Sequence, residues 1–265
     1  MPVTISTNPA SAVAARALDS ANKNLTDSLK RLSTGNRIAN NYDDAAGSAV
    51  ELKLKFQGKQ YDVLKSNLMN AVSFADTQQG VLGTAMAAVT RLGELQALAS
   101  DTTKSTTDKA LYQTETTALT VVMTQLAAQQ FNGNALFGAS QTLNTNLNAT
   151  PGTLAIGAED FAAAFTAGDY SDISAVTTAT VEADIQAIAT LQAGVGSIQS
   201  ALGYYYDNAA VTQSNISAAR GRIIDTDIST ESGEFARSQI LAQAASAMLA
   251  QANQIGAQSA MQLLM

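Results

Sequence analysis

The 265-residue chain contains no cysteine, no histidine and no tryptophan, and only three prolines. Without cysteine it forms no disulfide and no thiolate metal site, and without histidine it lacks the usual general base of neutral pH. The paired carboxylates Asp43/Asp44 and Asp225/Asp227 have no accompanying metal ligands or catalytic partners in the sequence. We interpret them as helix caps and linkers, and we expect a protein that is not an enzyme, with no catalytic residue, bound metal or cofactor.

Charged side chains are scarce, at 14% of the residues, and the net charge is −7. An acidic chain disfavours nucleic acid and anionic membrane surfaces as partners. No apolar run is long enough for a membrane-spanning helix, and the first 20 residues lack the basic and apolar regions of a signal peptide. We therefore expect no nucleic-acid or membrane partner, and any export would not use a cleaved leader.

Alanine-rich, proline-poor sequence favours long helices that pack closely side by side. Two segments, residues 45–100 and 181–226, carry apolar residues at heptad spacing, which indicates coiled-coil-like packing. The first series is Leu54, Tyr61, Leu68, Ala75, Leu82 and Val89, interleaved with Leu64, Ala71, Ala85 and Leu92. The second is Ile188, Leu191, Val195, Ile198, Leu202, Tyr205, Ala209, Ile216, Ala219 and Ile223. A shorter helix is predicted over residues 108–130, with Leu111, Leu119, Val122 and Leu126 facing inward.

Both ends of the chain read as amphipathic helices, and the outermost residues at each end carry no charge. Nothing is charged before Arg16 or after Arg237, and the polar positions of the last 28 residues are Gln, Ser and Asn. A helix face exposed to bulk water usually carries Lys and Glu, so we expect these ends to be covered by other protein chains and to become ordered on assembly. The predicted self-assembly residues are Leu18, Leu25, Leu29, Leu32, Leu241, Met248, Leu249, Ile255, Leu263 and Leu264.

The middle of the chain differs from the helical parts. Residues 131–134 (Phe-Asn-Gly-Asn) predict a hairpin turn, and residues 138–180 contain Thr, Asn and Gly around short apolar runs such as 153–156. The sequence thus predicts an all-α-dominated fold: a long antiparallel coiled-coil-like helical rod, folded as a hairpin, with a small β region in the middle. We expect a terminal assembly domain (1–43 and 227–265), a rod domain (44–137 and 181–226) and a short surface loop or β region (138–180).

Several motifs, in the same order along the chain, resemble those of bacterial flagellins. They are Arg31–Ile38 (RLSTGNRI), Asp43–Gly47 (DDAAG), Phe131–Gly133 (FNG), Arg222–Asp227 (RIIDTD), Ile240–Gln243 (ILAQ) and Leu249–Gln254 (LAQANQ). The resemblance covers residues 1–138 and 181–265. It implies a structural subunit that is exported unfolded and polymerises, as an open homo-oligomer, into the inner core and rod layers of the extracellular flagellar filament that drives swimming. The implied partners are other copies of the chain, the flagellar cap and junction proteins and an export chaperone.

The resemblance also implies a contact with an innate immune receptor. Arg91, Glu94 and Leu95 match the family segment that such a receptor recognises, and Glu115 occupies the position of a supporting acidic residue. Gly93 stands where the family commonly has an arginine.

Three other hypotheses differ in what they require. A hook–filament junction protein shares the terminal motifs but usually carries a larger middle region and forms a short ring. A secreted ligand or adhesin would use the rod to present the middle loop, which is short here. An enzyme would need a carboxylate-based site in a pocket.

Overall fold

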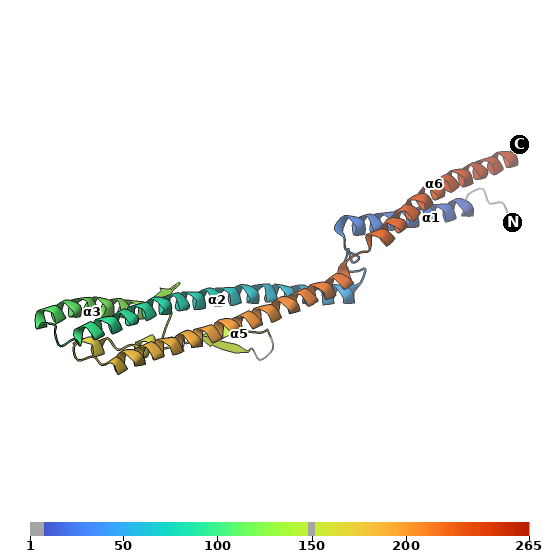
Figure 1. The fold of residues 1–265 in the computed structure, drawn as a ribbon. Helices are drawn as coiled ribbons and strands as arrows, with labels where there is room; N and C mark the ends of the chain where they lie inside the picture. The colour runs from blue at the N-terminus through green and yellow to red at the C-terminus, as the bar shows by residue number, and fades with distance from the viewer. Residues whose placement is uncertain (1–7, 148–151, 265) are drawn as a thin grey trace. The chain divides into compact units, whose positions relative to one another are not determined.

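The computed structural model describes residues 8–147 and 152–264, without the side chains of residues 259, 260 and 262–264. Its long helices are α1 (Pro9–Thr34), α2 (Ala45–Ala99), α3 (Thr106–Ala127), α5 (Thr178–Ile224) and α6 (Ile228–Leu264) (Figure 1). The expected helix-dominated class with a small β region in the middle is confirmed. The chain forms two compact units, one from residues up to 57 together with those from 215 on, and one from residues 58–214. Each unit is described separately below.

The core of the 58–214 unit is formed by the two predicted heptad series. Every member of the first series from Leu64 to Leu92 is buried, and Ile188, Val195, Leu202 and Ala209 of α5 are buried as well. A polar contact also joins the two helices, because Gln199 Nε2 donates to Asp76 Oδ1 at 2.9 Å. One prediction is wrong: Tyr205 is 38% exposed, and its neighbour Tyr206 packs against the core instead.

Helix α3 begins with a capping box, in which Ser105 and Asp108 each accept a hydrogen bond from the other's backbone N–H. Leu126 is buried and Leu119 packs on the core, as predicted. Leu111 and Val122, however, are 68% and 40% exposed. The face of α3 that packs on the core instead contains the buried residues Thr116, Thr120, Met123 and Leu126.

The buried threonines explain why the apolar pattern predicted the wrong inward face for α3. Thr116 Oγ1 donates to Tyr112 O at 3.0 Å, and Thr120 Oγ1 donates to Thr117 O at 2.9 Å. Each hydroxyl is satisfied within its own helix, so burying it leaves no unpaired donor. A pattern of apolar residues alone does not identify such positions as core.

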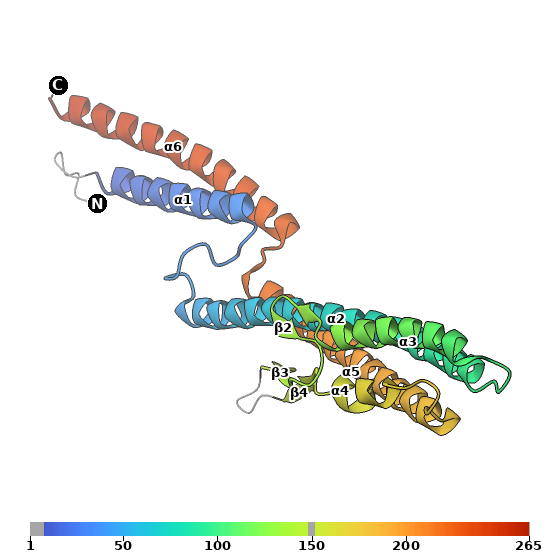
Figure 2. The same ribbon diagram turned by 90° about the vertical axis from the view of Figure 1, so that its left-hand side faces the viewer.

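The predicted hairpin turn at residues 131–134 is confirmed. β1 (Gln130–Phe131) pairs antiparallel with β2 (Asn134–Ala135), and the two turn residues, Asn132 and Gly133, have φ of 51° and 82°. Positive φ at both central positions is the conformation for which an Asn-Gly pair is favoured. A second antiparallel pair, β3 (Gln141–Asn144) with β4 (Thr153–Ile156), contains the predicted short strand (Figure 2).

The segment after β4 contributes to the core, although the sequence predicted a surface loop or β region there. It contains the short helix α4 (Phe161–Ala164) and the 3-10 turn η1 (Ala167–Tyr170). Its buried apolar residues are Phe161, Phe165, Tyr170, Ile173 and Val176. These residues are spread along an irregular segment, so no helical or strand period marks them in the sequence.

Glutamine side chains from α2 and α3 hold this segment in place. Gln96 Nε2 donates to Val176 O at 3.1 Å. Gln78 does the same for the loop that follows β2, donating from Nε2 to Leu136 O at 2.5 Å. Gln113 makes two such bonds, donating to Tyr170 O at 3.1 Å and accepting from Ile173 N at 2.6 Å. Irregular backbone needs partners for its polar groups when it is buried, and these glutamines supply them.

A buried polar pair joins the same segment to α5. The Tyr170 hydroxyl donates to Asp184 Oδ2 at 2.7 Å, and the two residues are only 1% and 8% exposed. Burial raises the pKa of the Asp184 carboxyl above its usual value of 3.8, against the lowering effect of the Tyr170 hydrogen bond.

The orientation of α3 can be tested with a pair of substitutions. Leu126→Ala removes a buried side chain and should lower the unfolding free energy by about 2–5 kcal/mol. Leu111→Ala removes an exposed one and should change it by less than about 0.5 kcal/mol. Urea unfolding followed by circular dichroism gives both values, and equal losses would show that α3 is oriented as the sequence pattern indicated.

Asp184 should give the stability of this unit a specific pH dependence. Because the pKa is higher in the folded state, the carboxyl's contribution is fully present below about pH 3.8 and is lost as the pH rises through the folded pKa. The unfolding free energy of Asp184→Asn relative to the natural chain should therefore increase as the pH is raised from 4 to 7. A difference that stays constant over this range, measured by urea unfolding, would contradict the assignment.

Candidate functional site: the terminal helix pair and its joint

Helices α1 and α6 lie side by side and antiparallel within the unit that contains both chain ends (Figures 1 and 2). Asn8, the N-cap of α1, accepts a hydrogen bond from Ser11 N at 3.1 Å and donates from Nδ2 to Ala252 O at 2.9 Å. Near the opposite end of the pair, Arg31 Nη1 lies 3.6 Å from Glu231 Oε2. These two contacts fix the register of the pair over more than 20 residues of each helix.

The seam between the two helices is narrow and is lined by small or polar side chains. Its most buried members are Ala21 and Ser28 of α1 and Glu231, Ser238 and Ala245 of α6, all 9% exposed or less. They recur every seven residues on each helix, which is the spacing of a coiled-coil seam. Small side chains at the contact let the helix axes approach closely.

The bulky apolar residues of α6 lie mostly outside this seam. Leu241, Met248 and Ile255 are 52%, 65% and 54% exposed, and they also recur every seven residues. The structure divides the apolar residues of α6 between two faces: Ala245 packs toward α1, whereas Leu241 and Met248 face outward. Two helices can bury only one narrow strip of each other, so the larger apolar residues remain accessible.

The predicted self-assembly residues are arranged accordingly. Leu18, Leu25, Leu32 and Leu249 are half-buried along the pair, and Leu29 is 54% exposed. The side chains of Leu263 and Leu264 lie outside the described part of the structure. We refer below to the exposed residues Leu241, Met248 and Ile255, with Ile240 at 66% exposed, as the outward face of α6. No charged residue follows Arg237, so this face is free of charge along its length.

A joint of backbone hydrogen bonds connects the links that follow α1 and α5. Asn36 and Asp225 form an antiparallel bridge; Arg37 N donates to Ile224 O at 2.6 Å and Thr226 N to Gly35 O at 2.9 Å. The Arg37 guanidinium adds a bond from Nη2 to Ile223 O at 2.7 Å. Gly35 also ends α1 with φ of 71°, a conformation that favours glycine. These hydrogen bonds hold the two links together as one short segment.

The predicted capping roles of the acidic residues near the joint are confirmed. Asp44 Oδ1 accepts from Gly47 N at 2.8 Å at the start of α2, and Asp227 Oδ1 accepts from Ser229 N at 2.8 Å at the start of α6. Hydrogen bonds from Thr230 and Ser229 hold the pKa of Asp227 below its usual value. These carboxylates start helices, and among the described residues no group of three His, Cys, Asp or Glu side chains is placed to hold a metal ion.

A partly buried ion pair joins α2 to α5 next to the joint. Arg220 Nε donates to Glu51 Oε1 at 2.7 Å, and the Glu51 side chain is only 8% exposed. A carboxylate at this depth depends on its partner, because an unpaired buried charge is costly.

The four predicted receptor-contact residues do not share one surface. Arg91 Nε lies 2.7 Å from Glu115 Oε1 and Arg91 Nη1 lies 2.6 Å from Glu94 Oε2, which forms an exposed ion-paired triad. Its carboxylates raise the pKa of Arg91, and Arg91 in turn lowers the pKa of Glu115. Leu95, in contrast, is fully buried in the core, so it does not contribute to the exposed surface that Arg91, Glu94 and Glu115 form. A side chain at Gly93 would meet Val181 Cγ1 at 3.0 Å, so the position has little room for the family's arginine.

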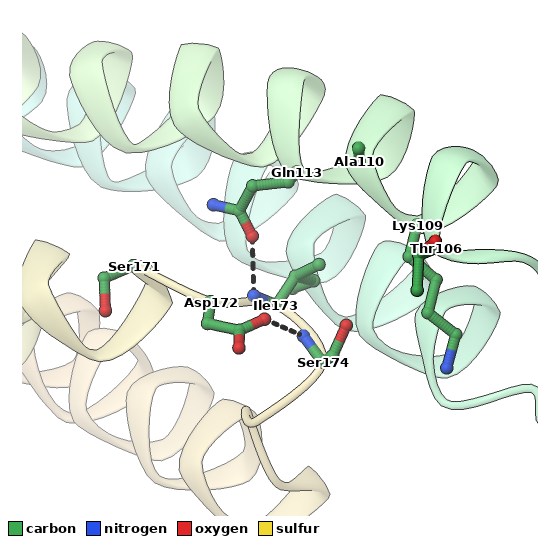
Figure 3. Close-up of a pocket in the computed structure, with 8 residues that line it drawn as sticks. All are labelled: Thr106, Lys109, Ala110, Gln113, Ser171, Asp172, Ile173 and Ser174. Carbon is green, nitrogen blue, oxygen red and sulfur yellow. Dashed lines mark hydrogen bonds between the residues drawn. The ribbon is translucent and has the colours of Figure 1, made fainter.

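A shallow hollow of about 300 Å³ lies between the start of α3 and residues 171–174 (Figure 3). Two of its polar side chains hold the loop: Gln113 Oε1 accepts from Ile173 N, and Asp172 Oδ1 accepts from Ser174 N at 2.9 Å. The hollow is therefore a packing junction. As for membrane insertion, the described helices include none with the length and apolar content of a bilayer span.

The ion pair at the joint gives a prediction that can be checked locally. Arg220→Leu leaves the Glu51 carboxylate buried and unpaired, which should cost about 1–3 kcal/mol and speed amide exchange in residues 47–57 roughly tenfold or more. Adding Glu51→Gln to this variant removes the stranded charge and should restore most of the protection. Hydrogen exchange with mass spectrometry reads both, and an unchanged rate in Arg220→Leu would mean that the pair contributes nothing.

Comparison with known proteins places these features in a family. The model of the bacterial flagellin N-terminal helical region matches residues 5–142, and that of the bacterial flagellin C-terminal helical region matches residues 178–264. Among solved structures, a crystal structure of Bacillus cereus flagellin superposes with a TM-score of 0.49 over 58% of this chain and 94% of that chain, at 23% identity.

Curated relatives match over nearly the full length. The "flagellar filament 33 kDa core protein" of Treponema phagedenis is 30% identical over 98% of this chain and 99% of its own length. A flagellin of Bacillus subtilis is 30% identical over 93% of this chain and 95% of its own, and one of Halalkalibacterium halodurans is 31% identical over 89% and 90%. The two family models and these relatives show that this chain belongs to the bacterial flagellin family.

Proposed function

We propose that this chain is the structural subunit of a bacterial flagellar filament and that its copies assemble through the outward face of α6. The observation that carries the proposal is that face: large apolar side chains more than half exposed on a helix that has no charge after Arg237. The family to which the chain belongs is one of structural proteins, and the name of the T. phagedenis relative describes a filament core protein.

Physical chemistry favours another copy of the chain as the partner for this face. Burying apolar surface is the main favourable term in association, and no charge has to be removed from water to cover these residues. Gln and Ser between the apolar rows can hydrogen-bond to a neighbour of the same composition. An unlimited fibre requires a contact between two different patches, since self-complementary contacts close into dimers.

The hydrogen-bonded joint supports the proposal that the terminal pair is a distinct assembly element. Its backbone bonds and the Glu51–Arg220 pair connect both links, so the two terminal helices are attached through a single defined segment. The expected division into a terminal assembly domain (1–43 and 227–265), a rod domain (44–137 and 181–226) and a middle region (138–180) belongs to this proposal.

The finer roles that the family resemblance implies also belong to this proposal. They are export to the cell exterior with the help of a chaperone, contacts with the flagellar cap and junction proteins, and a surface around Arg91, Glu94 and Glu115 that an innate immune receptor contacts. The relatives' names favour a filament subunit over a hook–filament junction protein, because they match nearly end to end and carry the words flagellin and filament core.

Polymerisation of the purified chain tests the proposal directly. Added ammonium sulfate strengthens apolar burial and should drive the natural chain into long uniform filaments, seen by negative-stain microscopy and sedimentation. Removing residues 238–265 should abolish filaments. Leu241→Gln, on the outward face, should raise the critical concentration at least about tenfold, since a buried unpaired amide costs more than about 1.4 kcal/mol.

Leu147→Gln is the matched control, because Leu147 is also exposed, at 38%, but lies in the middle region. It should leave the critical concentration unchanged. Filaments that form equally well without residues 238–265, or closed rings in place of filaments, would refute the proposal.

A further inference from the structure

The methionines of this chain differ sharply in their access to solvent. Met123 is fully buried and Met86 packs against the core, whereas Met69 is 50%, Met248 65% and Met261 64% exposed. Two of the three exposed methionines therefore lie on α6, the helix proposed to drive assembly. The remaining methionines, at positions 1 and 265, lie outside the described residues.

We propose that Met248, together with Met261, is an oxidation site that controls assembly: a peroxide converts the exposed thioether to a sulfoxide and thereby prevents the subunit from joining a filament. This inference rests on the proposed function, because it assigns a regulatory modification to the same assembly face. The partner that the modification excludes is a second copy of the chain.

The chemistry needs only a peroxide as the oxidant. The methionine sulfur donates a lone pair to one peroxide oxygen, the O–O bond breaks, and the second oxygen leaves as hydroxide. The proton of the oxygen now bonded to sulfur passes to that hydroxide, which becomes water. Sulfur loses two electrons, the peroxide gains them, and a new S–O bond replaces the lone pair. The step requires that the oxidant reach the sulfur, which the exposure of Met248 and Met261 permits and the burial of Met123 does not.

The surroundings of Met248 make the product hard to accommodate in a contact. Residues one turn away on either side are Ala244, Ala245, Gln251 and Ala252, so a single glutamine amide is the only side-chain donor nearby on the helix. The sulfoxide oxygen is a strong acceptor that water satisfies on the free subunit. Covering it with an apolar neighbour would strand that acceptor, which opposes burial.

Methionine also suits the position in its reduced form. Met248 lies in the row of Leu241 and Ile255, where a flexible thioether packs as well as an aliphatic side chain against an irregular neighbour. Assembly covers the row and so protects the sulfur. The free subunit is then sensitive to oxidation while the assembled one is resistant, and reduction of the sulfoxide restores competence.

The experiment treats the full-length chain with hydrogen peroxide before inducing polymerisation. Peptide mass spectrometry measures sulfoxide at each methionine, and sedimentation gives the critical concentration. We expect Met248 and Met261 to oxidise before Met86 and Met123, and the critical concentration to rise at least about tenfold, which corresponds to about 1.4 kcal/mol per subunit. Methionine sulfoxide reductases with a thiol reductant should reverse the change.

Variants separate the α6 methionines from the others. The double substitution M248L/M261L keeps apolar side chains of similar volume and should polymerise normally with or without peroxide. M69L removes the exposed methionine of α2 and should remain as peroxide-sensitive as the natural chain. M248Q places a polar group of similar length at the site and should impair assembly with no oxidant present, while circular dichroism shows that its helix content is unchanged.

Two results would overturn the inference. One is normal polymerisation of a chain whose Met248 and Met261 are fully converted to sulfoxide. The other is equal loss of assembly in oxidised M248L/M261L, which would place the sensitive residue elsewhere. Failure of the proposed function gives a different result, since the untreated natural chain would then form no filaments.

Discussion

The geometry of the α1–α6 seam is the constraint on which the proposed function depends. Two antiparallel helices can bury one strip of each other, and here that strip is occupied by Ala21, Ser28, Ser238 and Ala245. The larger side chains Leu241 and Met248 are left facing outward on a helix without charge. Because α1 and α6 bury small side chains between them and leave large apolar ones exposed, the single chain presents an apolar surface that another molecule can cover.

The 58–214 unit has a continuous apolar core of its own. Its heptad residues are buried in that core, and the irregular segment between β4 and α5 is held by Gln96, Gln113 and the Tyr170–Asp184 pair. A heptad pattern would assign these glutamine side chains to the surface. Here they form hydrogen bonds with buried backbone groups instead. The exposed large apolar residues on the charge-free part of α6 support the proposal that the terminal pair is the assembly element.

The sequence was informative where the structure is periodic. The start and end of α2, the buried heptad residues from Leu64 to Leu92, the Asn132–Gly133 turn and the caps Asp44 and Asp227 were all predictable, because each follows from local periodicity or backbone preference. These features need no knowledge of distant parts of the chain.

The errors occurred where tertiary contacts decide. The inward face of α3 was misassigned because Thr116 and Thr120 satisfy their own hydroxyls and pack in the core. Phe161 and Tyr170 are buried although they lie in irregular backbone and carry no period. The division of the α6 stripe between seam and outward face depends on the register with α1, which only the structure supplies.

The most direct test of the central claim compares backbone amide exchange of α6 in free and sedimented polymeric chain. The account predicts that exchange in residues 238–258 slows by orders of magnitude on assembly, while exchange in the β3–β4 hairpin stays the same. Equal exchange of α6 in the two states would show that its outward face remains uncovered in the polymer, and would contradict the claim that copies of the chain meet there.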